Sequence, residues 1–220
     1  MKFKNGKFQT ELNQVEKILK KLKLLEERNF FPVEDFDPAY YRNNTYFQNW
    51  SSLRANNIYD FVLTDNSTLH FKMTNDKLSF SFYECPFQCL TYKEFLEEHQ
   101  IDDDNEKTFN DYYETYLAQC SLRECSTMIR YDFDATSYFE GLHPISHIHI
   151  GFNNQVRISV DKILGPTGFC YFILRQQYPG VWKELLLSKE VDDYKKFKKL
   201  LTKVHLDYWK KLDKAEFHLT

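Results

Sequence analysis

Apolar and polar side chains alternate along two neighbouring stretches of this chain, residues 68–73 and 77–83. In the second stretch Leu78, Phe80 and Phe82 are each flanked by residues that can face water. A period of two residues places successive side chains on opposite faces of a β-strand. The Thr-Asn-Asp sequence at positions 74–76 is typical of a turn. The two stretches therefore predict an antiparallel pair with one buried face and one polar face.

Three later stretches, residues 128–134, 146–152 and 156–163, repeat this alternation with ionisable residues on the polar side. These polar residues are Arg130, Asp132 and Asp134, then His147 and His149, then Arg157, Ser159 and Asp161. If the three strands are antiparallel neighbours over one core, cross-strand partners lie about 4.5–5.5 Å apart at Cβ. We therefore expect carboxylates, imidazoles and guanidiniums to gather in one place. A slip of one residue in any strand would turn its polar side chains into the core.

Helical patterns precede, separate and follow the strands. Apolar residues at every third or fourth position predict helices over residues 9–28, 91–99, 109–120, 169–177, 181–188 and 192–216. Residues 59–63 predict a further strand. Pro32 and Pro38 predict irregular structure over residues 30–57, Asp102 begins an acidic linker at 102–104, and Asn153-Asn154 predicts a tight turn.

These elements predict one α+β domain over residues 1–220. We expect an antiparallel sheet of about six strands, in two meanders, packed against the N-terminal and C-terminal helices. The chain is 42% hydrophobic and 28% charged, which excludes a disordered protein. Its net charge of −3 provides no general attraction for nucleic acid, although the lysines of residues 192–214 allow a local basic surface.

Cysteine usage and hydropathy indicate the compartment. Five cysteines at irregular spacing predict reduced thiols, and Cys85 and Cys89 lack the second pair that a zinc finger needs. The chain begins without the apolar stretch of a secretory signal, and no segment approaches the roughly 20 apolar residues of a membrane span. We therefore expect a cytoplasmic protein that does not contact membranes.

The predicted cluster has two catalytic interpretations. In the first, Asp132, Asp134, His147 and His149 bind a divalent metal ion such as zinc, manganese, iron or magnesium. In the second, the two histidines act as general acid and base without a metal, and the aspartates orient the imidazole rings. Both interpretations point to phosphodiester chemistry.

The remaining candidate residues would contact the substrate. Arg130 and Arg157 would bind its phosphate, because a guanidinium matches the geometry of phosphate oxygens. His143 and Tyr138 come from the connection at residues 135–144, where His143 would act as a third imidazole and Tyr138 as a substrate contact.

A polar sheet face is also common without any function, because Arg–Asp pairs occur on many half-exposed sheets. Histidine is sparse in this chain, with 7 residues in 220, so the close spacing of His143, His147 and His149 favours a functional site. The chain contains no Gly-rich phosphate loop, no Gly-x-Ser-x-Gly and no His-Glu-x-x-His. ATPase, serine hydrolase and zincin activities therefore have no support.

Residues 129–151, together with 156–160 and 172–175, resemble a bacterial family catalogued as domain of unknown function 2290. The shared pieces are the Arg-x-Asp strand, the His-Pro-x-Ser-His-x-His-x-Gly block at 143–151 and the following Arg strand. The resemblance lies mainly between Ile129 and Pro179. It implies a bacterial or mobile-element origin and no particular activity. Similar His-rich signatures belong to toxin or phage-defence nucleases, which is an argument by analogy.

We therefore predict a phosphodiester hydrolase or nuclease of bacterial toxin or antiviral defence biology, acting on nucleic acid or on a nucleotide. The alternative is a non-catalytic subunit of a multi-protein complex, which binds a partner protein or nucleic acid through its aromatic residues and its basic C-terminal helix. A third hypothesis, binding of a small nucleotide signal without turnover, would use the same arginines.

Overall fold

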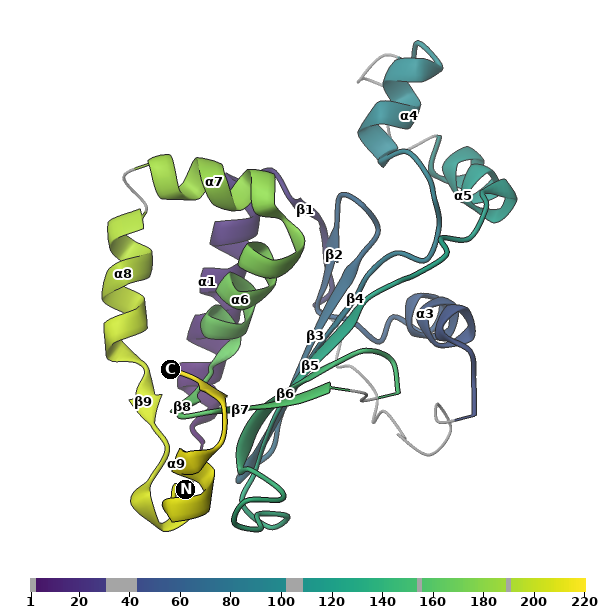
Figure 1. Cartoon of the computed structure of the whole chain (residues 1–220). Coiled ribbons are helices and arrows are strands. Elements are labelled where there is room, and N and C mark those ends of the chain that lie inside the picture. The colour runs from purple at the N-terminus through teal and green to yellow at the C-terminus, as the bar shows by residue number, and fades with distance from the viewer. Residues whose placement is uncertain (1–2, 31–42, 102–108, 154–155, 189–190) are drawn as a thin grey trace. The chain divides into compact units, whose positions relative to one another are not determined.

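The computed structural model describes residues 3–30, 43–101, 109–153, 156–188 and 191–220, and combines helices with a mainly antiparallel sheet (Figure 1). Neighbouring strands of this sheet follow the order β1-β2-β3-β4-β5-β6-β7-β10, and β8 pairs with β9 in a second sheet. The predicted α+β class is confirmed. The predicted number of about six strands is too low, because β1 and β10 are too short to produce an alternating pattern.

The chain forms two compact units. The first comprises Met1–Leu22, His70–Phe82 and Met128–Thr220, and the second comprises Lys23–Leu69 and Tyr83–Thr127. Strands β3 (Thr68–Met73) and β4 (Lys77–Tyr83) have the predicted bounds, and their residues 70–73 and 77–82 belong to the first unit. All the candidate site residues also lie in the first unit.

The first unit is built on the predicted meander of β5 (Met128–Asp134), β6 (Ser146–Ile150) and β7 (Val156–Val160). Both pairs are antiparallel, with Tyr131 opposite Ile148 and Ile148 opposite Ile158. The last strand, β10 (His218–Leu219), joins β7 in parallel and was not predicted. Antiparallel neighbours with their apolar sides on one core are the arrangement that the alternation predicts, so the register is confirmed.

Helices α1 (Asn5–Lys21) and α6 (Pro166–Gln177) cover the apolar face of this sheet. Aromatic rings make the contact: the ring centroid of Phe80 lies 5.5 Å from that of Tyr131, 5.9 Å from that of Phe169 and 6.2 Å from that of Phe8. Tyr131 is fully buried, and its hydroxyl lies 3.0 Å from Ser146 Oγ and accepts a hydrogen bond from the backbone of the loop before α6. Buried polar atoms of this kind need such partners.

The C-terminal region differs from the predicted long helix over residues 192–216, which is wrong after Leu200. Helices α7 (Pro179–Leu187) and α8 (Val191–Leu200) are followed by β9 (Thr202–Lys203), the 3₁₀ helix η2 (Leu206–Tyr208) and α9 (Lys211–Ala215). Strand β9 pairs with β8 (Lys162–Ile163). The helical spacing of apolar residues continues past Leu200, but the pairing with β8 and the burial of Val204 and Trp209 override it.

In the second unit, the predicted helix over residues 9–28 is wrong at its C-terminal end. Strand β1 (Leu25–Arg28) pairs antiparallel with β2 (Phe61–Leu63), so the chain leaves the helix before Leu25. Lys23 adopts a positive φ of 55°, a conformation that ends a helix. Cross-strand pairing therefore outweighs the helical spacing of the leucines.

Helix α3 (Tyr46–Ala55) lies where irregular structure was predicted, and that prediction is wrong for these residues. Thr45 and Gln48 form a capping box, a signal that is visible in the sequence. Helices α4 (Tyr92–Glu98) and α5 (Asn110–Gln119) confirm the predicted ones. Pro32, Pro38, the acidic residues 102–104 and Asn154 lie outside the described residues.

Two further predictions concern the whole chain. None of the described helices combines the length and the apolarity needed to cross a membrane. All five cysteines are free.

Candidate functional site

The register of β5, β6 and β7 arranges the polar residues in two rows across the sheet. Arg130, His149 and Arg157 are Cα partners in one row, and Asp132, His147 and Ser159 are partners in the next. Cross-strand partners of this kind have neighbouring side chains on one face. The structure therefore brings the predicted imidazoles, Asp132 and the two arginines together.

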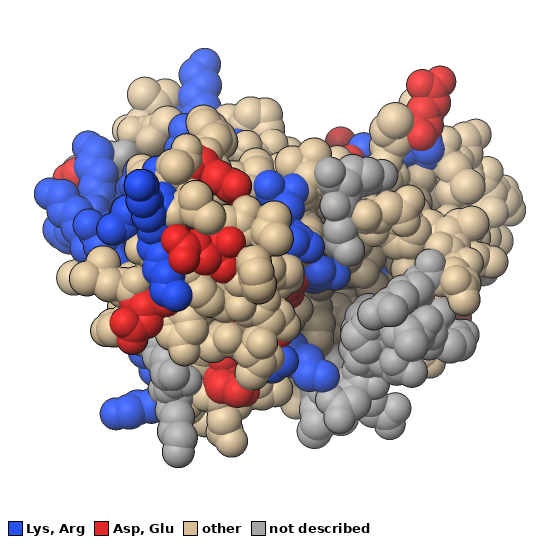
Figure 2. All heavy atoms as spheres, turned by 60° about the horizontal axis from the view of Figure 1, so that its bottom comes forward, with Lys and Arg blue, Asp and Glu red and all other residues tan. Residues whose placement is uncertain are grey.

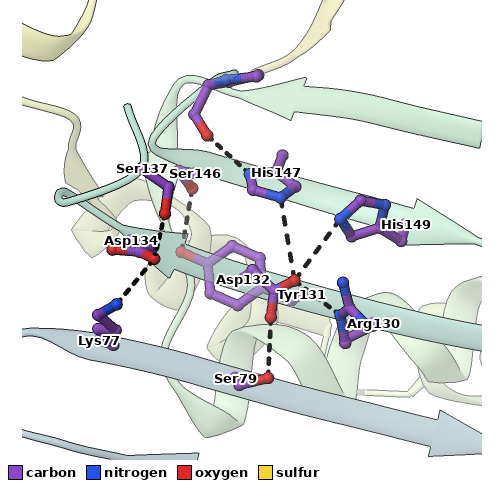
Figure 3. A network of polar contacts seen from close by, with 11 residues as sticks. Lys77, Ser79, Arg130, Tyr131, Asp132, Asp134, Ser137, Ser146, His147 and His149 are labelled. Atoms are coloured by element: carbon purple, nitrogen blue, oxygen red, sulfur yellow. Dashed lines mark hydrogen bonds and ion pairs between the residues drawn. The ribbon is translucent and has the colours of Figure 1, made fainter. Parts of the chain in front are cut away.

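Asp132 is the centre of the contacts (Figure 3). Its Oδ1 accepts a hydrogen bond of 2.8 Å from Ser79 Oγ, and its Oδ2 accepts one of 2.7 Å from Arg130 Nε. The same Oδ2 faces Nε2 of His149 at 3.6 Å and Nε2 of His147 at 3.9 Å. Because a carboxylate oxygen has two lone pairs, Oδ2 retains one acceptor site beside its bond to Arg130.

The orientation of His147 is set by the backbone. Its Nδ1 lies 2.7 Å from the carbonyl oxygen of Pro144. A carbonyl oxygen only accepts, so Nδ1 carries a proton and the Nε2 of the neutral ring is left as an acceptor. This Nε2 faces the Asp132 carboxylate, which is also an acceptor. Two facing acceptors repel unless a proton or another cation lies between them.

Both imidazoles are held in the neutral form. The side chains of His147 and His149 are 2% and 3% exposed. Burial lowers the pKa of His147 to about 4, against the opposing effect of Asp132. Burial and the nearby Arg130 lower the pKa of His149 to about 3. At neutral pH a proton is therefore not available to separate the two facing acceptors.

The arrangement suits a divalent cation. Among the described residues, Asp132, His147 and His149 each offer one ligand atom, and these three atoms lie within 4.8 Å of one another. Ligands about 2.1 Å from a tetrahedral zinc ion lie about 3.4 Å apart. The two Asp–His separations, 3.6 and 3.9 Å, exceed that value by a few tenths of an ångström, so small side-chain rotations would bring the atoms to ligand distance.

The surroundings of the two rings differ. Metal-binding histidines commonly donate their other ring N–H to a carbonyl or a carboxylate, as His147 does to Pro144. Nδ1 of His149 is buried without a hydrogen-bond partner among the described residues. His147 is therefore the better supported of the two ligands.

Asp134, a predicted co-ligand, lies outside this group. Its carboxylate accepts hydrogen bonds from Lys77 Nζ at 3.0 Å, Thr136 Oγ1 at 2.7 Å and Ser137 Oγ at 2.8 Å. Although burial raises its pKa, the hydrogen bonds from Thr136, Lys77 and Ser137 bring it well below its usual value. Asp134 thus stabilises the turn after β5 by accepting hydrogen bonds from its residues.

His143 and Tyr138 occupy the connection between β5 and β6. The ring of His143 packs edge-on against His147 with a centroid distance of 5.0 Å, next to the three candidate ligands. Tyr138, a predicted substrate contact, instead donates a hydrogen bond of 2.7 Å to Asp213. Its hydroxyl therefore links this connection to α9 through a hydrogen bond.

The two arginines differ in availability. Arg157 is exposed beside His149, and no hydrogen bond or ion pair of its side chain occurs among the described residues. Arg130 is 30% exposed and bonded to Asp132 through Nε. Arg157 therefore has all its donors available for an anion, whereas Arg130 first neutralises and orients Asp132.

Ser79 was not predicted as part of the site. The alternation of residues 77–83 placed it on the polar face, but strand order cannot be read from alternation. Because β4 lies next to β5, Ser79 reaches Asp132 across the strand pair.

The fold and this cluster define the class: an α+β protein with an Asp-His-His constellation, whose two histidines are buried, on one face of an antiparallel sheet. The chain belongs to a family of uncharacterised conserved proteins, DUF2290, which matches residues 21–210. The match extends well beyond residues 129–179, the stretch that carries the resemblance. No curated protein and no solved structure matches the chain.

Proposed function

We propose that this protein is a metal-dependent phosphodiester hydrolase in which Asp132, His147 and His149 bind the metal ion. The observation that carries the proposal is the bare Nε2 of His147, which faces the Asp132 carboxylate at 3.9 Å while its Nδ1 is bonded to Pro144. A divalent cation between these atoms replaces a repulsion with two coordinate bonds. The neutral imidazole that it requires is the form that burial favours.

A metal-free acid–base pair is the weaker interpretation of the same residues. General acid–base catalysis at neutral pH needs one ring that is protonated, with a pKa near the working pH. The pKa values of about 4 for His147 and about 3 for His149 leave both rings neutral. Two neutral bases without an acid are poor catalysts of this type but good metal ligands.

The donor set favours zinc or manganese. Magnesium prefers a shell of oxygen ligands and is poorly suited to two imidazoles. Two histidines and one carboxylate also hold iron in some oxygenases, so the identity of the metal must be established before the substrate. Three protein ligands leave a coordination position open, which is typical of catalytic rather than structural sites. A metal ion held by these residues would supply a water nucleophile at neutral pH.

The arginines favour a phosphate-containing substrate. Arg157 lies in the same row as His149 and Arg130, so its guanidinium is placed beside the candidate metal ligands. A guanidinium binds phosphate oxygens in a bidentate manner and stabilises the charge that develops on them. Phosphodiesters of nucleic acids or nucleotides are the substrate class that this combination fits.

Elemental analysis of the purified protein is the first test. We expect about one zinc or manganese ion per chain, lost in a His147→Gln/His149→Gln variant and retained in a His99→Gln/His205→Gln control, whose histidines are exposed. Hydrolysis of bis-p-nitrophenyl phosphate, single-stranded DNA and RNA should follow the metal content. The metal site would be ruled out if the wild type contains no metal ion, or if the His147→Gln/His149→Gln variant retains it.

A non-catalytic binding subunit is the second candidate, favoured by a different observation. Four large apolar side chains near the C-terminal end are more than 70% exposed: Leu187, Leu200, Leu206 and Phe217. Exposed apolar groups of this size are typical of protein-binding surfaces. Replacing Leu200 and Leu206 with serine should abolish the biological effect under this hypothesis and leave it intact under the hydrolase hypothesis.

A further inference from the structure

A partly open cavity of about 240 Å³ lies on the other face of the sheet, lined by α6, α8 and the ends of β7 and β10. Its walls are apolar and aromatic, and include Ile148, Leu164, Tyr171 and Phe197. The rings of Tyr171 and Phe197 are in contact, with centroids 5.5 Å apart, so the aromatic wall joins α6 to α8. A cavity of this size suits a small molecule rather than a chain segment.

Three basic side chains line the same cavity: Lys162, Arg175 and Lys198. No Asp or Glu contributes to the lining, and none of the ion pairs among the described residues involves these three cations. The neighbouring lysines Lys195 and Lys196 do have acidic partners on α8. Basic side chains gather on the part of the surface where α8 lies (Figure 2). The cavity therefore combines apolar walls with three basic side chains, and the last residue, Thr220, also lines it.

We propose that this cavity binds a small organic anion, a molecule with an apolar body and one anionic head group. The body would lie against Tyr171, Phe197 and Leu164, which lose water-exposed apolar area on binding. The head group, a carboxylate or a phosphate, would be bound by Arg175 and Lys198 through charge-assisted hydrogen bonds. A nucleoside monophosphate, with an aromatic base, and a medium-chain carboxylate share this chemistry.

The cavity is independent of the candidate metal centre. Ile148 lies between His147 and His149 in β6, and successive residues of a strand point to opposite faces. The cavity wall and the imidazoles are therefore on opposite sides of the same strand. Substitutions in the cavity can be tested in a protein whose Asp132, His147 and His149 are intact.

Titration of the full chain with 8-anilinonaphthalene-1-sulfonate, an aromatic anion, tests the site by fluorescence and calorimetry. We expect saturable binding at one molecule per chain. An Arg175→Gln/Lys198→Gln variant should weaken it by at least about tenfold, because each charged contact contributes roughly 1.5 kcal/mol or more. Lys199→Gln is the matched control: it removes a charge from the same helix next to Lys198 but outside the cavity lining.

Competition then identifies the source of the anion. Displacement of the dye by adenosine monophosphate indicates a nucleotide, and displacement by octanoate indicates an acyl carboxylate. Gly168→Ala adds a methyl group to the cavity wall with contacts of 3.5 Å or more, and should weaken binding without unfolding the protein. Absence of saturable binding, or an affinity that is unchanged in Arg175→Gln/Lys198→Gln, would overturn the proposal.

Discussion

The Nδ1 atom of His147 lies 2.7 Å from the carbonyl oxygen of Pro144, and this contact determines which ring nitrogen faces Asp132. Pro144 lies two residues before the start of β6, so the segment that leads into this strand also fixes the tautomer of its first histidine. The consequence is an acceptor-to-acceptor contact of 3.9 Å between His147 and Asp132. The main proposals on the site depend on this relationship.

Histidine NMR tests the tautomer directly. In the metal-free protein at neutral pH, the ¹⁵N shifts of His147 should identify a neutral ring protonated at Nδ1, because a carbonyl oxygen accepts only from an N–H. Addition of zinc should shift the Nε2 resonance and leave Nδ1 protonated. His205, exposed on the surface, serves as the reference ring. A His147 ring protonated at Nε2 would contradict the arrangement.

The stability of the metal-free protein should decrease as the pH falls from about 6.5 to about 4. The pKa of His147 is about 4 in the folded protein against 6.5 in the unfolded chain, so the unfolded state binds more protons in this range. His149 extends the range to about pH 3. Glu11, whose pKa is raised by burial, has the opposite effect.

Urea denaturation in the presence of a chelator measures this dependence. The free energy of unfolding of the wild type should be constant above about pH 7 and fall steadily below it. In the His147→Gln/His149→Gln variant the slope below about pH 6.5 should be much smaller, whatever the stability at neutral pH. Equal slopes in the two proteins would show that the histidines are not buried in the neutral form.

Ser79→Ala should lower the affinity for zinc by roughly 10- to 100-fold, as is usual when a hydrogen bond to a metal ligand is removed. The hydroxyl donates to Oδ1 of Asp132 at 2.8 Å and so orients the carboxylate whose Oδ2 faces the histidines. Competition with a chromophoric chelator gives the affinity. Ser81→Ala, two residues along the same face of β4, is the matched control. Equal affinities in the two variants would remove Ser79 from the site.

Arg157→Gln should raise the KM for a phosphodiester by about tenfold, because Arg157 would bind the phosphate of the substrate. The metal content should be unchanged, because Arg157 lies beside His149 but, among the described residues, forms no hydrogen bond or ion pair with a candidate ligand. Steady-state kinetics and elemental analysis measure the two effects. Lys199→Gln removes a positive charge from α8, outside both proposed sites, and should leave KM unchanged. Loss of metal in Arg157→Gln would instead indicate a structural role.

The sequence was most informative where alternation is long. Strands β4 and β5, of seven residues each, were predicted with their faces and bounds, and β6 was predicted with its faces but ends two residues earlier than expected. Their pairing followed from the requirement for one shared core. The three-residue strand β2 lies within the stretch predicted as residues 59–63, whereas β1 and β10 were missed because so few residues cannot show a period. The register that pairs Asp132 with His147 could therefore be predicted from the sequence, whereas strand β10 could not.

Contacts that depend on strand order or on distant segments could not be predicted. Asp134 has the same strand, face and residue type as Asp132, yet it lies in the turn network with Lys77, while Asp132 meets the histidines. Their roles differ because Asp132 is paired with His147, whereas Asp134 lies beyond Ser146, the first residue of β6. Tyr138 likewise donates a hydrogen bond to Asp213, which lies 75 residues further along the chain.

Asp213→Asn should loosen the connection at residues 135–144. The carboxylate is 3% exposed and accepts hydrogen bonds from Tyr138 Oη at 2.7 Å, from the Gly141 backbone at 3.0 Å and from the Lys210 backbone at 2.9 Å. An amide keeps the shape but turns one acceptor into a donor that faces another N–H or O–H. The variant should therefore lose about 1–3 kcal/mol of stability.

Hydrogen exchange locates the effect of Asp213→Asn. The amide of Gly141 and its neighbours in residues 138–143 should exchange faster, and the ring of His143, which belongs to this connection, should lose its fixed contact with His147. Asp207→Asn, an equivalent change at a side chain that is 78% exposed, is the control and should alter neither stability nor exchange. Unchanged exchange at Gly141 in Asp213→Asn would show that the connection is held by its own bridge between Phe139 and His143 rather than by α9.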